Sequence, residues 1–207
     1  MTDIADEEVD SEVSGGLNIN ENYKVFKSRG LHFLHLNINS ILSKIDELKL
    51  IAHNSKAAII GISESKLDET VLDNEIQIQG YNILRSDRNR NGGGVACYIR
   101  NDICFNQREN FSNEIENIFV DILLPKTKPI LIGILYRPPD QSGFLEKLAT
   151  AITNTTSFDN QEVYILGDLN INLIFQGRRI PNGIKRYREF CAVHGLKQII
   201  ESPTRVT

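Results

Sequence analysis

The segment that decides the fold reads LHFLHLNINS over residues 31–40 and, one helical stretch later, AAIIGISE over residues 57–64. Both apolar runs are short, as buried strands are, and they end in Asn37 and Glu64. Between them, apolar residues recur at helical spacing from Ile41 to Ala52, with Asn39 or Ser40 as the expected N-cap. The segment therefore predicts a strand–helix–strand unit.

The rest of the chain predicts more strands and two more helices. Short apolar or alternating runs separated by Gly, Asn, Asp and Pro indicate antiparallel strands at residues 81–84, 95–99, 118–124 and 130–135. Gly92-Gly93-Gly94 is expected to be a mobile loop. Later patterns predict a helix at 144–152, a strand at 163–166, a helix from Ile184 to a C′ glycine at Gly195, and a strand starting at 196–200. This order predicts an α+β fold in which helices cover sheets.

Composition restricts the class of protein. The chain has 207 residues, 41% of them hydrophobic and 24% charged, which is typical of a globular protein that needs no disulfide or structural metal to fold. Its three cysteines lack CxxC spacing and follow no secretory n-region, so we expect an intracellular location. No apolar run approaches the roughly 20 residues of a membrane span, so we expect no membrane association.

Charge is distributed unevenly along the chain. The net charge is −4, but residues 1–12 hold six acidic residues and no basic one, so the remainder is slightly basic. We expect residues 1–29 to be a disordered acidic tail and residues 30–207 to be one domain. Basic residues gather in two clusters: Arg85, Arg88, Arg90, Arg100 and Arg108, and Arg178, Arg179, Lys185, Arg186 and Arg188. Either cluster alone is more often solvated surface, so a polyanionic partner is permitted and not demonstrated.

Four predicted strands end in polar residues: Asn37, Glu64, Tyr136, and Asp168 with Asn170. Each has an ordinary explanation when taken alone. An asparagine at this position is usually a cap or turn residue, and a glutamate is usually a solvated carboxylate. The tyrosine suits a core aromatic whose hydroxyl reaches an edge, and the last pair suits an Asx turn. The coincidence of all four favours a shared site.

The chemistry of that site follows from its residue types. Carboxylates, amides and a phenol without Cys or His spacing favour a hard cation such as Mg²⁺ over zinc. The sequence contains no HExxH, GxSxG or P-loop motif, and His32 and His35 are interpreted as ordinary strand residues. Metal-assisted phosphate chemistry is the class that remains.

Five motifs in order resemble the endonuclease/exonuclease/phosphatase superfamily: 36–40 (LNINS), 62–64 (ISE), 92–96 (GGGVA), 136–139 (YRPP) and 167–170 (GDLN). The 136–139 motif and the closing SPTR at 202–205 look most like the apurinic-type endonuclease domain of non-LTR retrotransposons. The resemblance extends from about Gly30 to the C-terminus. It implies a four-layer α/β sandwich of two packed mixed sheets flanked by helices.

The resemblance also implies residue roles. Glu64 would be the principal ligand of Mg²⁺, or alternatively Mn²⁺, with Asn37 contacting the metal shell or the scissile phosphate. Tyr136 would donate a hydrogen bond to the phosphate. Asp168 would activate or orient the attacking water, and Asn170 would steady the phosphate.

On the same grounds the substrate would be DNA. Arg88, Arg90 and Arg137 are the predicted DNA-binding residues. The products would be a 5′-phosphate and a 3′-hydroxyl, and in retrotransposons that hydroxyl primes reverse transcription. The expected partners are therefore DNA and a reverse transcriptase domain on the same polyprotein, and the expected location is the nucleus.

One departure from the family pattern bears on activity. Members carry a further Ser-x-Asp strand and a terminal Ser-Asp-His segment, which supply a second aspartate and the catalytic histidine. Residues 1–207 contain neither, so we expect a domain truncated at its C-terminus, without its last strands, and weak or no nicking. An alternative reading is an inactive remnant that at most binds DNA or a protein. A phosphoinositide or sphingolipid phosphodiesterase is a third reading, disfavoured by the 136–139 motif and by the lack of a lipid-facing apolar segment.

Overall fold

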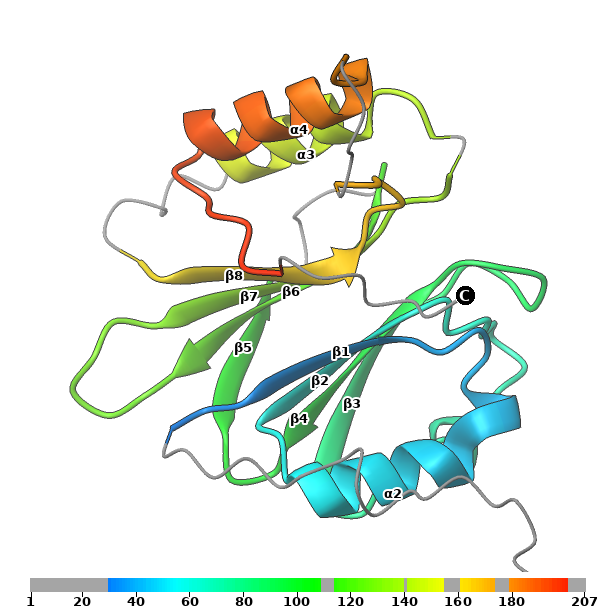
Figure 1. The fold of residues 1–207 in the computed structure, drawn as a ribbon. Helices are drawn as coiled ribbons and strands as arrows, with labels where there is room; N and C mark the ends of the chain where they lie inside the picture. The colour runs from blue at the N-terminus through cyan, green and yellow to red at the C-terminus, as the bar shows by residue number, and fades with distance from the viewer. Residues whose placement is uncertain (1–29, 109–113, 140, 155–160, 174–178, 201–207) are drawn as a thin grey trace, which may run out of the picture.

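A computed structural model describes residues 30–108, 114–139, 141–154, 161–173 and 179–200 (Figure 1). Within these ranges the chain forms two four-stranded sheets. The predicted tail at 1–29 lies outside the described residues. In the described part of the chain, none of the helices has the length and apolar character that crossing a membrane requires.

The first sheet has the order β1-β2-β4-β3. Its strands are β1 (Phe33–Asn37), β2 (Ile59–Ser63), β3 (Tyr81–Ser86) and β4 (Val95–Arg100). Strands β1 and β2 are parallel, whereas β4 is antiparallel to both neighbours, so the sheet is mixed. Its outer face is covered by α2 (Ile45–Ser55), which follows the short helix η1 (Leu42–Lys44); a second short helix, η2 (Asp73–Glu75), precedes β3.

The second sheet has the order β5-β6-β7-β8. Its strands are β5 (Cys104–Arg108), β6 (Glu116–Leu123), β7 (Ile130–Tyr136) and β8 (Val163–Asp168), of which only β7 and β8 are parallel to each other. Helices α3 (Phe144–Asn154) and α4 (Asn182–Val193) cover its outer face (Figure 1).

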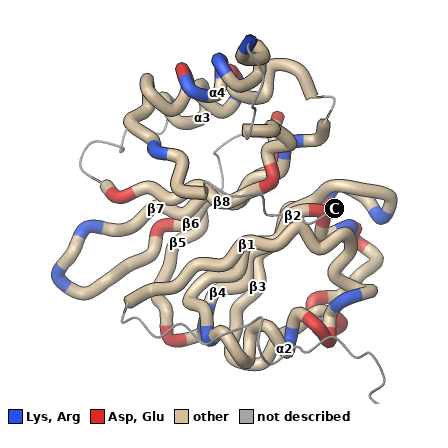
Figure 2. Tube along the Cα trace, in the orientation of Figure 1, with Lys and Arg blue, Asp and Glu red and all other residues tan. Residues whose placement is uncertain are grey.

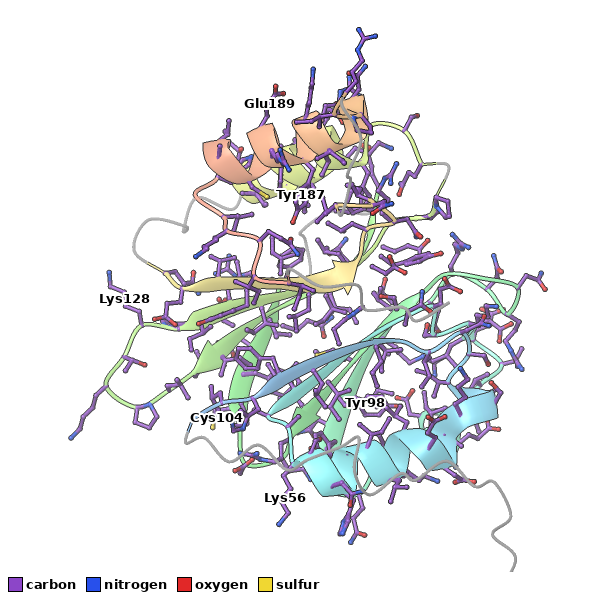
Figure 3. The ribbon with its side chains drawn as sticks, in the orientation of Figure 1. Lys56, Tyr98, Cys104, Lys128, Tyr187 and Glu189 are labelled. Atoms are coloured by element: carbon purple, nitrogen blue, oxygen red, sulfur yellow. The ribbon has the colours of Figure 1, made fainter. Side chains whose placement is uncertain are left out.

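Three apolar clusters hold these layers together. Leu48 and Ala52 of α2 pack on the outer face of the first sheet, where Figure 3 also shows Tyr98. Phe144 and Phe190 pack on the outer face of the second. The cluster between the sheets joins residues of both, including Ile59, Cys97, Ile132 and Ile134. The molecule is therefore a four-layer α/β sandwich, and the predicted α+β fold class is confirmed.

Two local predictions are wrong, and one strand was not predicted. Residues 196–200 are irregular, with Ile199 and Ile200 exposed, so no strand starts there. Neither Asn39 nor Ser40 caps the first helix, because α2 begins only at Ile45, after η1. Strand β5 was not predicted, because its sequence, CFNQR, is mostly polar and three of its five residues are exposed. The helix end at Gly195 is confirmed by its φ of 63° just after the C-cap.

The topology brings four strand ends to one edge. Because β1 and β2 are parallel, as are β7 and β8, the carboxyl ends of each pair lie together, and contacts between β1, β2 and β8 place both pairs at the same edge of the sandwich. Gly167 permits the close approach of β8 to β7, since a Cβ there would collide with the Leu135 carbonyl.

Candidate active site

The amide of Asn37 joins carboxylates from the two sheets. Its Nδ2 donates to Glu64 Oε1 at 2.9 Å and to Asp168 Oδ2 at 2.8 Å. Asn37 ends β1, Glu64 follows β2, and Asp168 ends β8 of the other sheet. The structure thus brings together three predicted site residues that are up to 131 positions apart in sequence, with Asn37 exposed and both carboxylates only partly exposed.

Tyr136 is a fourth member of this cluster and contacts the Glu64 carboxylate. The residue is 5% exposed at the end of β7, and its hydroxyl donates to Glu64 Oε1 over 3.3 Å. Burial, together with the nearby Glu64 carboxylate, raises the pKa of Tyr136 to about 12. The phenol therefore keeps its proton at neutral pH and acts as a hydrogen-bond donor.

The backbone around Glu64 adopts an uncommon conformation. Glu64 has a φ of 54°, and Asn39, Ser40 and Lys66 also have positive φ. Left-handed backbone is unfavourable for residues with a Cβ and persists only where the surroundings impose it. Here the two loops bond each other, from Ser40 N to the Glu64 carbonyl at 2.8 Å and from Lys66 Nζ to Asn39 Oδ1. The Glu64 carboxylate is thus presented by a fixed main chain.

The loop after β8 is held differently. Asn170, with a φ of 49°, donates its N–H to Asp168 Oδ1 at 3.0 Å and its Nδ2 to the Arg137 carbonyl at 2.7 Å. The Arg137 guanidinium donates to the carbonyls of Leu169, Asn170 and Gln141. Asp168 and Asn170 are therefore bonded to each other, and the Arg137 guanidinium contacts the main chain of the same loop.

The three predicted DNA-binding arginines lie in different surroundings. Arg88 forms an ion pair with Glu116 at 2.8 Å and donates to the Gly92 carbonyl. Arg90 is exposed in the turn between β3 and β4, whereas Arg137 is half-buried in the loop contacts just described. Their contact with DNA stays a prediction.

Other arginines of the first basic cluster are engaged in ion pairs. The pairs are Arg85 with Asp73 and Asp87, Arg100 with Asp102, and Arg108 with Asp121. Figure 2 shows the same interspersion of acidic and basic residues over the described chain. These three arginines therefore fit surface ion pairing better than a continuous basic face.

Two residues of the site region were not predicted from the sequence. Nε2 of His35 lies 2.6 Å from the hydroxyl of Ser63, the residue that pairs in register with Asn37. Burial lowers the pKa of His35 to about 4, so the imidazole is neutral at pH 7. Strand alternation could have placed His35 on the face of Asn37, two residues on. Glu116, at the start of β6, lies in register with Tyr136. Nothing in its local sequence indicates this position, which follows from the pairing of β6 with β7.

A cavity of about 410 Å³ adjoins the Asp168 side of the site. Arg137 and Asn170 line it, together with residues at the first turns of α3 and α4 such as Phe144, Ile184 and Arg186. Its wall combines apolar side chains with charged and amide groups, and it opens next to the loop that carries Asn170.

The donor set fits a hard divalent cation. In the described part of the chain there is no cluster of three or more His, Cys, Asp and Glu residues that could enclose a metal ion. Mg²⁺ does not require such a cluster, because it keeps several waters and binds through one or two carboxylates. Glu64 and Asp168 provide two carboxylates that lie close together, because each accepts a hydrogen bond from the same Asn37 nitrogen.

Comparison with solved structures identifies proteins of similar fold. No family model and no curated protein matches the sequence. Among solved structures, the endonuclease domain of TRAS1, a telomere-specific non-LTR retrotransposon, is similar at 17% identity with a TM-score of 0.65, over 84% of this chain and 74% of that one. The chain therefore shares the fold of this endonuclease domain.

Two further structures agree. The AP endonuclease LMAP from Leishmania major is 14% identical with a TM-score of 0.65, over 78% of this chain and 66% of that chain. An AP endonuclease from Archaeoglobus fulgidus is 17% identical with a TM-score of 0.57, over 79% of this chain and 71% of that chain. At these identities the likeness shows the fold alone, and the four-layer α/β sandwich that the resemblance implied is the fold that these endonucleases share with the chain.

Proposed function

We propose that the chain is a metal-dependent endonuclease that nicks DNA by hydrolysing a phosphodiester bond. The observation that carries this proposal is the Asn37 amide shared by the Glu64 and Asp168 carboxylates, which come from two different sheets. Two carboxylates, an amide and a protonated phenol at one exposed edge suit a hard cation and a phosphate group. The likeness to the TRAS1 endonuclease domain and to AP endonucleases supports DNA as the substrate.

In this proposal Glu64 holds Mg²⁺ or Mn²⁺, with Asn37 beside it. When bound, such an ion polarises a phosphoryl oxygen and offsets the charge that develops there. Tyr136 keeps its proton at neutral pH and donates a hydrogen bond to a phosphate oxygen. Asn170 steadies the phosphate next to Asp168, whose Oδ1 already accepts the Asn170 N–H.

Asp168 orients the attacking water and accepts its proton. The water oxygen forms a bond to phosphorus while the bond from phosphorus to the 3′ oxygen breaks, and that oxygen takes up a proton from the solvent. The products are a 5′-phosphate and a 3′-hydroxyl. On the resemblance of Tyr136-Arg137-Pro138-Pro139 to retrotransposon endonucleases, we propose that this hydroxyl primes a reverse transcriptase, with Arg88 and Arg90 contacting the DNA backbone.

The test is nicking of supercoiled plasmid with protein in excess of DNA and Mg²⁺ present. We expect open-circular product that EDTA suppresses and that a DNA polymerase extends from its 3′ end. The matched control is the double variant Glu64→Gln, Asp168→Asn. Nicking by the wild-type chain no faster than by this control would contradict the proposed activity.

A further inference from the structure

Glu116 is the first residue of β6 in the second sheet, at the edge of the sandwich where the candidate site lies. It pairs in register with Tyr136, and its side chain is 18% exposed. The partners of its carboxylate belong to the loop between β3 and β4 of the first sheet. Gly94 N–H donates to Oε2 at 2.5 Å, and Arg88 donates to Oε1 at 2.8 Å. Glu116 therefore links the two sheets beside Tyr136.

The sequence of that loop suits this contact. Gly93 and Gly94 have φ values of 70° and 80°, which favour glycine. A Cβ on Gly93 would overlap the Arg88 guanidinium and come within 2.6 Å of Glu116 Oε2, and a Cβ on Gly94 would overlap the Ser65 hydroxyl. The loop expected from its three glycines to be mobile is thus tied between Glu116 and the segment that follows Glu64.

The other side of the same loop bonds that segment through the main chain. Ser65 N–H donates to the Gly94 carbonyl at 3.1 Å, and Lys66 N–H donates to the Gly93 carbonyl at 3.0 Å. These bonds immediately follow Glu64, whose left-handed backbone requires an external constraint. A continuous path of contacts therefore runs from the Glu116 carboxylate through Gly94 to the residue next to the Glu64 carboxylate.

We propose that Glu116 is a positioning residue for Glu64, holding the proposed metal-binding carboxylate in place by accepting the Gly94 N–H. This inference rests on the proposed function only in assigning the metal to Glu64. The role depends on the reach of the acceptor oxygen and not on its charge. Changes to groups that orient metal ligands typically lower metal affinity about 10- to 100-fold.

Three variants separate reach from charge. Glu116→Gln keeps one oxygen at the same distance for the Gly94 N–H and loses both the charge and the bond from Arg88. Glu116→Asp keeps the charge and withdraws the oxygens by one methylene, and Glu116→Ala removes both the charge and the acceptor. The control is Asp102→Asn, which removes a partly exposed ion pair with Arg100 at the opposite end of β4. Thermal unfolding verifies that each variant is folded.

The first measurement is titration of each protein with Mn²⁺ alone, with free Mn²⁺ followed by its electron paramagnetic resonance signal. We expect Glu116→Asp and Glu116→Ala to bind Mn²⁺ about tenfold more weakly than wild type, and Glu116→Gln and Asp102→Asn to bind it nearly as well. The reverse order, with Glu116→Asp normal and Glu116→Gln weak, would overturn the proposal in favour of a charge effect. If Glu116→Ala does not fold, the other two variants still decide.

The second measurement needs no metal. Amide hydrogen exchange at Ser65 and Lys66 should be faster in Glu116→Asp than in wild type and unchanged in Asp102→Asn. Equal exchange and equal Mn²⁺ affinity in wild type and Glu116→Asp would overturn the positioning role. The absence of Mn²⁺ binding by the wild-type protein would instead refute the proposed metal-dependent function, which distinguishes the two failures.

Discussion

The two halves of the site are held in place by different means. The Asn37–Glu64 half rests on main-chain bonds between two loops with left-handed residues, to which Glu116 adds a side-chain contact from the other sheet. The Asp168–Asn170 half is framed by one side chain, Arg137, whose guanidinium donates to three carbonyls. The first half is therefore held mainly by main-chain bonds between loops, whereas in the second the Arg137 guanidinium makes three of the contacts and Asn170 makes two more. Asn37 joins the halves.

The largest expected effect comes from removing one carboxylate from either half. We expect Glu64→Gln and Asp168→Asn each to lower single-turnover plasmid nicking by about 10²- to 10⁴-fold, because the first removes a charged metal ligand and the second a proton acceptor. The melting temperature should change little, since both side chains lie at the partly exposed edge. A variant that nicks at the wild-type rate would remove that residue from the proposed chemistry.

Arg137→Ala tests the dependence of the second half on one side chain. We expect the free energy of unfolding to fall by about 1.5–3 kcal/mol, as for lost hydrogen bonds of a charged group, together with slower nicking. Arg137→Lys should recover little, because an ammonium cannot reproduce the forked geometry of a guanidinium. Urea unfolding measures the first quantity. Unchanged stability combined with a shallower salt dependence of DNA binding would instead favour the predicted DNA contact.

The thiol of Cys97 lies in the apolar core between the two sheets, and its burial leads to a prediction about pH. Burial raises the pKa of the Cys97 thiol to about 12, against an ordinary value near 9. The folded state therefore keeps a proton that the unfolded state loses, so stability is full below pH 9 and declines as the pH rises toward 12. We expect the free energy of unfolding to fall with pH above 9 by up to about 1.4 kcal/mol per unit more in wild type than in Cys97→Ala. Parallel pH profiles for the two proteins would contradict this.

The smallest expected effect concerns the exposed Arg90. If it contacts one phosphate, Arg90→Ala should reduce the slope of log affinity for duplex DNA against log salt by about 0.9 and leave unfolding unchanged. Fluorescence anisotropy over a salt series measures the slope. Lys128→Ala, in the turn between β6 and β7 at the opposite end of the second sheet, is a matched control. An unchanged slope in Arg90→Ala would leave this arginine as solvated surface.

Much of the fold could be predicted because it depends on local patterns. The apolar runs that form β1, β2 and β8 end in polar residues, and the α2 and α4 patterns have helical periodicity. The layers of the sandwich and the residues at its edge could therefore be predicted. The polar strand β5 could not be recognised, because its place at the sheet margin leaves it largely exposed. The apolar run at 196–200 predicted a strand that lacks a partner within the described residues.

The positions of the proposed site residues at the strand ends could be predicted, whereas the contacts that support them could not. Asn37, Glu64, Tyr136 and Asp168 terminate recognisable strands, so sequence position sufficed. The contributions of Glu116 and of the Arg137 guanidinium depend on which loops the folded sheets bring together. The left-handed backbone of Glu64 likewise follows from bonds to a loop about 30 residues away.

The central claim is that Glu64, with Asn37 beside it, holds a metal ion next to Asp168, which comes from the other sheet and shares the Asn37 amide. The most direct test is Mn²⁺ binding by the wild-type chain, by Glu64→Gln and by Asp168→Asn, measured from the free-ion paramagnetic signal. We predict one Mn²⁺ bound by the wild type, loss of that ion in Glu64→Gln, and weaker binding in Asp168→Asn. Binding of equal stoichiometry and affinity by all three proteins would contradict the claim.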